Sequence, residues 1–140
     1  MKITDIKGTV TLINGVEMPY FGLGVFGSEE GQMTVQAIHW ALEAGYRHID
    51  TATLYYNEKS VGEAVRTSGL KREDLFITTK VWNSDQGFQN ALDAFQSSLD
   101  KLHMDYVDLY LIHWPVKEKF IYNWQAVESL YEQKLVRANG

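Results

Sequence analysis

The feature that most constrains the fold is a repeated exchange of strand-like and helix-like segments. Strand-like runs cover 20–26, 46–50, 75–82 and 106–115, and each is followed by a segment with helical spacing of its apolar residues. Links are short, and no charge block or low-complexity stretch interrupts the series. Four strand–helix units in succession predict parallel βαβ units wound in one direction. The candidate folds are an open doubly wound sheet and a (β/α)8 barrel.

The helical segments carry apolar stripes and end signals. Segment 30–45 has apolar residues at spacings of three and four, and the strongest stripe runs through 88–102. Asn57 stands where a helix N-cap belongs, and Gly69 stands where a C-cap glycine belongs. A fourth helix is predicted over 124–134.

Both ends of the chain depart from the repeat. Near the start, a β-rich run and the pair Asn14-Gly15 predict a small hairpin that Pro19 closes. At the end, the sequence stops at KLVRANG, where a fifth strand is due. We expect Asn139 to suit a buried strand poorly. The first and fourth strands are therefore expected to present unpaired edges.

Composition narrows the class of protein. With 140 residues and 45% hydrophobic content, the chain is long enough for one domain with a core, over residues 1–140. A net charge of -5 disfavours binding to nucleic acid. The lack of cysteine excludes disulfides and thiolate chemistry, and no apolar run reaches the length of a signal or membrane segment. We expect a soluble, cytoplasmic protein without a membrane partner.

A glycine pattern keeps the doubly wound alternative open. Gly22, Gly24 and Gly27 satisfy the G-x-G-x-x-G spacing of dinucleotide-binding folds, and Asp50 follows at a suitable distance for the ribose-binding acid. A single match of this kind is weak support, so residue pattern alone does not separate the two folds.

Polar and aromatic residues gather at the predicted carboxyl ends of the strands, where parallel α/β folds bind ligands. In order they are Phe26, Asp50, Lys80, Trp82, His113 and Trp114, with Tyr55 or Tyr56 just beyond the second strand. Each has an ordinary structural explanation: a helix cap, a solvated lysine, a satisfied histidine, or packing. Their succession along one rim makes these separate explanations less probable together.

The chemistry of such a group is specific. A free phenol has a pKa of about 10, and a neighbouring lysine cation favours the phenolate. A carboxylate holds the lysine charged, and an imidazole can hydrogen-bond a substrate oxygen. Together these groups suit proton transfer to a carbonyl oxygen. Reduction of that carbonyl requires a cofactor, because no side chain supplies a hydride.

The segment GYRHIDTATLYYNEKSVGEAV (45–65) resembles the signature of the aldo-keto reductases. ITTKVW and VDLYLIHWP resemble that family's third and fourth strands, and NGVEMPYFGLGVF resembles its opening hairpin and first strand. The resemblance implies a (β/α)8 barrel that reduces aldehydes and ketones with NADPH, and it makes the glycine spacing a coincidence. NADH is not excluded, because the residues that meet the 2′-phosphate are absent.

The resemblance also implies roles for residues of the rim. The catalytic tetrad falls on Asp50, Tyr55, Lys80 and His113, with Tyr55 as general acid, because the spacing D-T-A-x-x-Y selects it over Tyr56. Cofactor contacts fall on Gly24, Val25 and Asp50. An apolar substrate pocket falls on Phe26, Trp82 and Trp114.

A complete barrel needs about 250 residues, so the chain corresponds to the N-terminal half of one. The open edges and inner face predict self-association. The alternative to a carbonyl reductase is a non-catalytic half-barrel that serves assembly or interaction. A metal site is not expected, because the histidines His39, His48, His103 and His113 lack paired ligand spacing.

Overall fold

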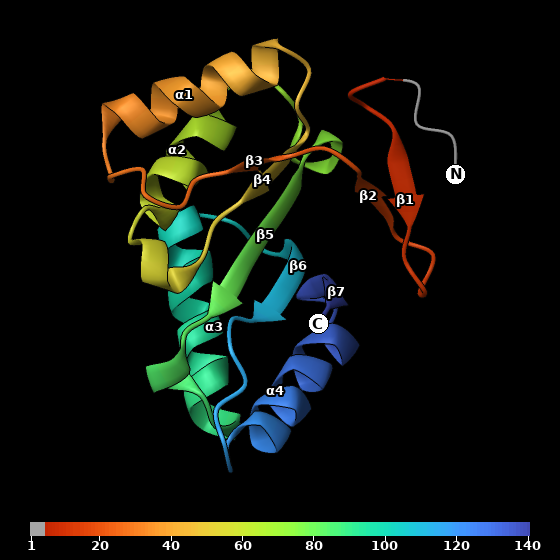
Figure 1. Cartoon of the computed structure of the whole chain (residues 1–140), viewed down its shortest axis with the longest axis vertical. Helices are drawn as coiled ribbons and strands as arrows, with labels where there is room; N and C mark the ends of the chain where they lie inside the picture. Colours follow the sequence, from red (N-terminus) through yellow and green to blue (C-terminus); the bar gives the residue numbers. More distant parts are fainter. Residues whose placement is uncertain (1–4) are drawn as a thin grey trace.

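A computed structural model describes residues 5–140 of the chain. The elements in order are β1 (Thr9–Thr11), β2 (Glu17–Pro19), β3 (Leu23–Gly24), α1 (Gln32–Glu43), β4 (His48–Asp50), α2 (Glu58–Thr67), β5 (Phe76–Val81), α3 (Phe88–Leu102), β6 (Val107–Ile112), α4 (Phe120–Glu132) and β7 (Val136–Asn139). Strands β3 to β7 form one parallel five-stranded sheet in chain order. Helices wrap one side of these strands, and the hairpin β1–β2 lies apart, beside β7 (Figure 1).

The predicted hairpin is confirmed. β1 and β2 pair antiparallel, and Gly15 takes a φ of 84° in the turn that joins them. Asn14 at the tip donates its side-chain amide to the carbonyl of Arg137 at 2.9 Å. The hairpin tip therefore contacts the last strand of the sheet, although the two are far apart in the sequence.

The predicted edge at the fourth strand is wrong, because a fifth strand forms. β7 pairs with β6, with Val136 opposite Val107. Asn139, which we expected to suit a strand poorly, is half-buried and donates its amide to the carbonyl of Val127 in α4 at 3.4 Å. This bond gives the amide a partner inside the fold. The strand order leaves β3 and β7 as the open edges of the sheet.

The core lies between the sheet and the helices. The fully buried residues of the sheet include Ile49, Ile77 and Tyr110. On the helices, Ile38 of α1 is fully buried and Phe95 of α3 is 1% exposed. On these helices the apolar stripes predicted from the sequence face the sheet. The stripe on α3 excludes its first residue, since Phe88 remains 44% exposed.

Two local features refine the predicted helices. α4 begins at Phe120, before the predicted start of that helix. α2 packs closely on α3 because Gly62 lacks a side chain: a Cβ there would lie 2.2 Å from the carbonyl oxygen of Leu102. Gly69 follows α2 with a φ of 76°, in agreement with its prediction as a helix-ending glycine.

Candidate functional site

Four polar side chains predicted from the sequence meet at the carboxyl end of the sheet. Asp50 is the last residue of β4, Lys80 the penultimate residue of β5, and His113 follows β6 directly. Tyr55 ends a short 3-10 turn, Thr53–Tyr55, between β4 and α2. Since neighbouring parallel strands end at one rim, side chains from distant parts of the sequence converge there.

Lys80 is the hub of the cluster. Its ammonium donates to Asp50 Oδ1 at 2.6 Å, to the main-chain oxygen of Thr51 at 2.9 Å and to the phenol oxygen of Tyr55 at 3.4 Å. An ammonium has three donors, and each has an acceptor in this arrangement. The lysine side chain is 12% exposed and the Asp50 side chain 33% exposed, so the ion pair opens to solvent on the side of the acid.

Aromatic rings surround the phenol of Tyr55. The ring of Phe26 lies 5.1 Å away between centroids, and that of His113 lies 5.6 Å away, nearly perpendicular. Trp82 also packs edge-on against His113, with ring centroids 5.1 Å apart. Neighbouring Tyr56 is 75% exposed and takes a left-handed backbone conformation, with a φ of 53°. Of the two tyrosines, Tyr55 lies in the cluster.

His113 has its pKa lowered below the ordinary value by partial burial and by the nearby positive charge of Lys80, while Asp50 opposes the change. The imidazole is therefore neutral near pH 7. Its buried Nδ1 has no hydrogen-bond partner within residues 5–140. A neutral imidazole can donate a hydrogen bond to a substrate oxygen without transferring a proton to it.

The remaining predicted residues lie at the same rim with different exposures. Gly24 pairs with Asp50, and an added Cβ there would meet nothing within 4 Å. Val25 is 2% exposed, so its side chain belongs to the core rather than to the rim surface. Phe26 and Trp114 are 76% and 60% exposed. The structure therefore leaves two large aromatic side chains open to solvent beside the cluster.

Two residues that support the cluster were not predicted to do so from the sequence. Asn57 is fully buried and, instead of capping α2, bonds Val25, Ser28 and Thr51. Gln86 is 1% exposed and donates its side-chain amide to the carbonyl of Trp114 at 2.5 Å. The sequence signal for such residues is weak, since a polar side chain in a loop is usually exposed.

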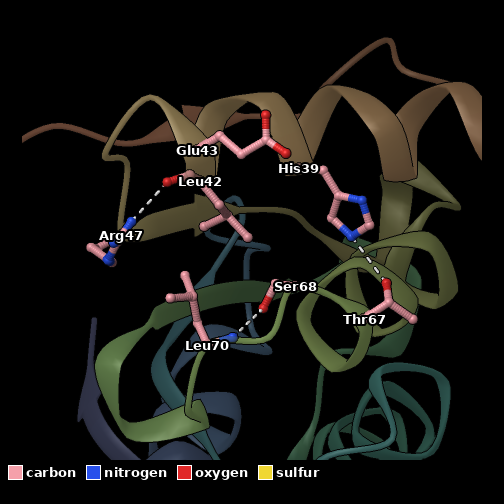
Figure 2. A pocket seen from close by; sticks show the side chains of 7 residues that line it. All are labelled: His39, Leu42, Glu43, Arg47, Thr67, Ser68 and Leu70. Carbon is pink, nitrogen blue, oxygen red and sulfur yellow. Dashed lines mark hydrogen bonds between the residues drawn. The ribbon is translucent and has the colours of Figure 1, made fainter.

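A separate hollow lies away from the rim, between the C-terminal ends of α1 and α2. It is lined by His39, Leu42, Glu43, Arg47, Thr67, Ser68 and Leu70 (Figure 2). Two of its polar side chains are bonded within the protein: Arg47 donates to the carbonyl of Leu42, and His39 Nε2 lies 3.0 Å from Thr67 Oγ1. The hollow does not bring together an acid, a lysine, a phenol and an imidazole as the rim does, so the rim is the stronger candidate site.

Metal-binding clusters and membrane-spanning helices are both absent from the described residues. Within 5–140, no group of three or more His, Asp or Glu side chains is arranged to hold a metal ion. Over the same residues, no helix is both long enough and apolar enough to cross a membrane.

Comparison with known proteins agrees with the resemblance seen in the motifs. Residues 20–140 match the model of the aldo/keto reductase family. The chain is 56% identical over 131 residues to a 9,11-endoperoxide prostaglandin H2 reductase of Trypanosoma cruzi, covering 94% of this chain and 46% of that protein. It is 53% identical over 137 residues to the glyoxal reductase of Bacillus subtilis, covering 98% and 50%.

Solved structures give the same result for the fold. An aldo/keto reductase from Brucella melitensis superposes with a TM-score of 0.90 at 51% identity, over 94% of this chain and 52% of that one. A Bombyx mori aldo-keto reductase in complex with NADP superposes with a TM-score of 0.88 at 35% identity, over 98% and 50%. The fold is therefore the first half of a (β/α)8 barrel, and the chain spans about half the length of these relatives.

Proposed function

Because the chain belongs to the aldo/keto reductase family, we propose that its rim cluster reduces the carbonyl group of small aldehydes or ketones to an alcohol. The observation that carries this proposal is the position of the Lys80 ammonium, bonded to Asp50 on one side and within 3.4 Å of the Tyr55 phenol on the other. Relatives named as glyoxal and methylglyoxal reductases support a small dicarbonyl as the first substrate to test.

In this proposal Tyr55 is the general acid, because its phenol oxygen accepts a hydrogen bond from the Lys80 ammonium and its hydroxyl proton can pass to the substrate. The cation stabilises the negative charge that develops on the phenol oxygen as the proton leaves for the carbonyl oxygen. Asp50 holds the Lys80 ammonium in place through a 2.6 Å ion pair. His113, neutral near pH 7, orients the carbonyl oxygen by donating a hydrogen bond.

A nicotinamide cofactor, NADPH in the first instance, would supply the hydride that no side chain provides. Gly24 suits its approach, since the backbone is exposed there and no neighbouring atom fills the space above it. Asp50 lies beside Gly24 in the sheet. Lys80 is already paired with Asp50 and is not free to hold a phosphate. Exposed Phe26 and Trp114 would form apolar walls for the substrate.

The test starts with binding and proceeds to turnover. NADPH is titrated into the chain while tryptophan fluorescence is recorded, because Trp82 and Trp114 lie beside the cluster. NADH is titrated in parallel.

Oxidation of NADPH is then followed with glyoxal or methylglyoxal as the substrate. Tyr55→Phe should abolish this oxidation, whereas Tyr56→Phe, which removes the exposed neighbouring hydroxyl, should leave it unchanged. Equal rates for Tyr55→Phe and the unaltered chain would contradict the proposal.

A second candidate, a non-catalytic assembly module, is favoured by one observation: the open edges β3 and β7 lie at opposite ends of the sheet. Unpaired parallel edges are templates for further strands, so we infer that copies of the chain associate. Sedimentation at micromolar concentration should show a dimer or larger species, and a uniform monomer would contradict association. Association without saturable NADPH binding would favour the module over the enzyme.

A further inference from the structure

The segment that presents Tyr55 is closed by a hydrogen bond between its two ends. Thr51 follows Asp50 directly, and its hydroxyl donates to the side-chain oxygen of Asn57 at 2.7 Å. Both side chains are fully buried. The loop between them contains the 3-10 turn that ends at Tyr55. The position of the phenol is therefore set by a loop whose ends are tied together inside the protein.

The same amide ties this loop to the preceding one. Asn57 Nδ2 donates to the carbonyl oxygens of Val25 and Ser28, each at 2.9 Å. Val25 precedes Phe26, whose ring packs against Tyr55. One buried side chain thus fixes both the loop that carries the phenol and the loop that carries its aromatic neighbour.

The backbone next to Tyr55 is in a conformation that needs such support. Tyr56 has a φ of 53°, which non-glycine residues seldom adopt and which persists only where surrounding contacts impose it. Tyr56 lies between Tyr55 and Asn57, and its side chain is 75% exposed. Its side chain therefore contributes little to holding this conformation, whereas the bonds of Asn57 act on the adjoining residue.

The loop is also joined to the lysine. The main-chain oxygen of Thr51 accepts a hydrogen bond from Lys80 Nζ at 2.9 Å. Thr51 thus takes part in two bonds: its main-chain oxygen accepts from the ammonium, and its side chain ties the loop that presents the phenol to Asn57. A shift of this loop changes the separation of the two groups, which is 3.4 Å.

We propose that Asn57, through its bond to Thr51, is a positioning residue that holds the Tyr55 phenol against Lys80 and Phe26. This assignment rests on the proposed function for its catalytic meaning. The position of the Tyr55 ring can be tested without cofactor or turnover. The positioning role and the proposed function can therefore fail separately.

The experiment uses the chain labelled with 13C in its tyrosines. The ring signals of Tyr55 are identified by their loss in Tyr55→Phe. Thr51→Val removes the hydroxyl with little change of shape, Thr51→Ser retains it, and Asn57→Ala removes the amide. Asn90→Ala, in the exposed first turn of α3, is the control for loss of an amide.

In Thr51→Val and Asn57→Ala, the Tyr55 ring signals should move toward those of free tyrosine, because the ring leaves its packing against Phe26 and His113. Thr51→Ser and Asn90→Ala should keep the original spectrum. A lower melting temperature with unchanged Tyr55 signals would overturn the proposal and leave Asn57 a structural role only. If Asn57→Ala does not fold, the Thr51→Val and Thr51→Ser pair decides.

Turnover gives a second readout. If the chain oxidises NADPH, kcat for Thr51→Val should fall by roughly 10- to 100-fold, the scale expected for misplacing a catalytic group, with a smaller change in KM for NADPH. An unchanged kcat together with shifted Tyr55 signals would show that the phenol tolerates displacement, and would overturn the catalytic part of the proposal. Absence of turnover in the unaltered chain would count against the proposed function and leave the spectral test intact.

Discussion

Two ion-pair clusters lie at opposite ends of the same sheet and differ in how completely they are bonded. At the amino end, Asp108 is fully buried and accepts from Arg72 and Arg137, each at 2.7 Å, and from the main-chain N–H of Ile77 at 2.8 Å. At the carboxyl end, the Asp50 side chain keeps 33% of its surface exposed beside Lys80. The first cluster is closed by protein groups, and the second is open to solvent.

The difference separates a structural role from a functional one. Asp108 links β6 to β5 and β7 and has no oxygen left for a ligand, since both accept bonds from protein donors. At the other end the Asp50 carboxylate stays partly exposed, and the exposed rings of Phe26 and Trp114 stand nearby. In barrels of this class the carboxyl ends of the strands carry chemistry and the amino ends carry stability. The bonding of the two clusters follows that division.

The largest effect on stability is expected at the closed cluster. Asp108→Asn removes the charge that two arginines share, and breaking a buried ion pair typically costs about 3–5 kcal/mol. Urea unfolding should show this loss. Asp105→Asn, at an exposed carboxylate close by in the sequence, is the control and should stay within about 0.5 kcal/mol. Equal stability of the two variants would show that the closed cluster does not hold the sheet.

A smaller loss of stability is expected at the open cluster. Lys80→Met removes the cation from Asp50, but the acid is partly exposed and can be solvated. A partly exposed pair is worth about 1 kcal/mol or less. Urea unfolding of Lys80→Met should therefore differ little from that of the unaltered chain, while any NADPH oxidation is lost. A loss as large as that of Asp108→Asn would erase the contrast between the clusters.

Two histidines, His48 at the start of β4 and His113 just after β6, should make stability depend on pH. Burial is the main cause that lowers the pKa of both His48 and His113 below the ordinary 6.5. The unfolded chain therefore binds more protons just below pH 6.5, so stability should fall as the pH is lowered through that value. His48→Gln should weaken this dependence, whereas substitution of exposed His103 should change it less. Thermal unfolding at several pH values measures the effect, and an unchanged slope in His48→Gln would contradict it.

The smallest effect is expected at the hairpin tip. Asn14→Ala removes the exposed amide that bonds the carbonyl of Arg137, and exposed substitutions usually change stability by no more than about 0.5 kcal/mol. The clearer readout is sedimentation, because the substitution uncovers part of the β7 edge. A greater tendency to associate would support that edge as a contact surface, and no change would indicate that copies meet elsewhere.

Much of this arrangement follows from local sequence. Apolar spacing predicts α1 and α3, the cap residues Asn57 and Gly69 predict α2, and Asn14-Gly15 predicts the hairpin turn, because side-chain period, capping and turn chemistry act over a few residues. The succession of Asp50, Lys80 and His113 at strand ends was also readable, since parallel strands share one rim. These residues could be grouped before any contact between them was known.

Tertiary structure decided what local signals could not. The place of Asn57 in the chain predicts a helix cap, but its side-chain bonds run to Thr51 and to the loop after β3. Propensity disfavours Asn139 in a strand, yet a carbonyl of α4 accepts a hydrogen bond from its amide. Both depend on partners brought close only by folding. The sequence by itself determined the elements and the groups at the rim, and the packed structure decided which polar side chains are bonded and which remain open to a ligand.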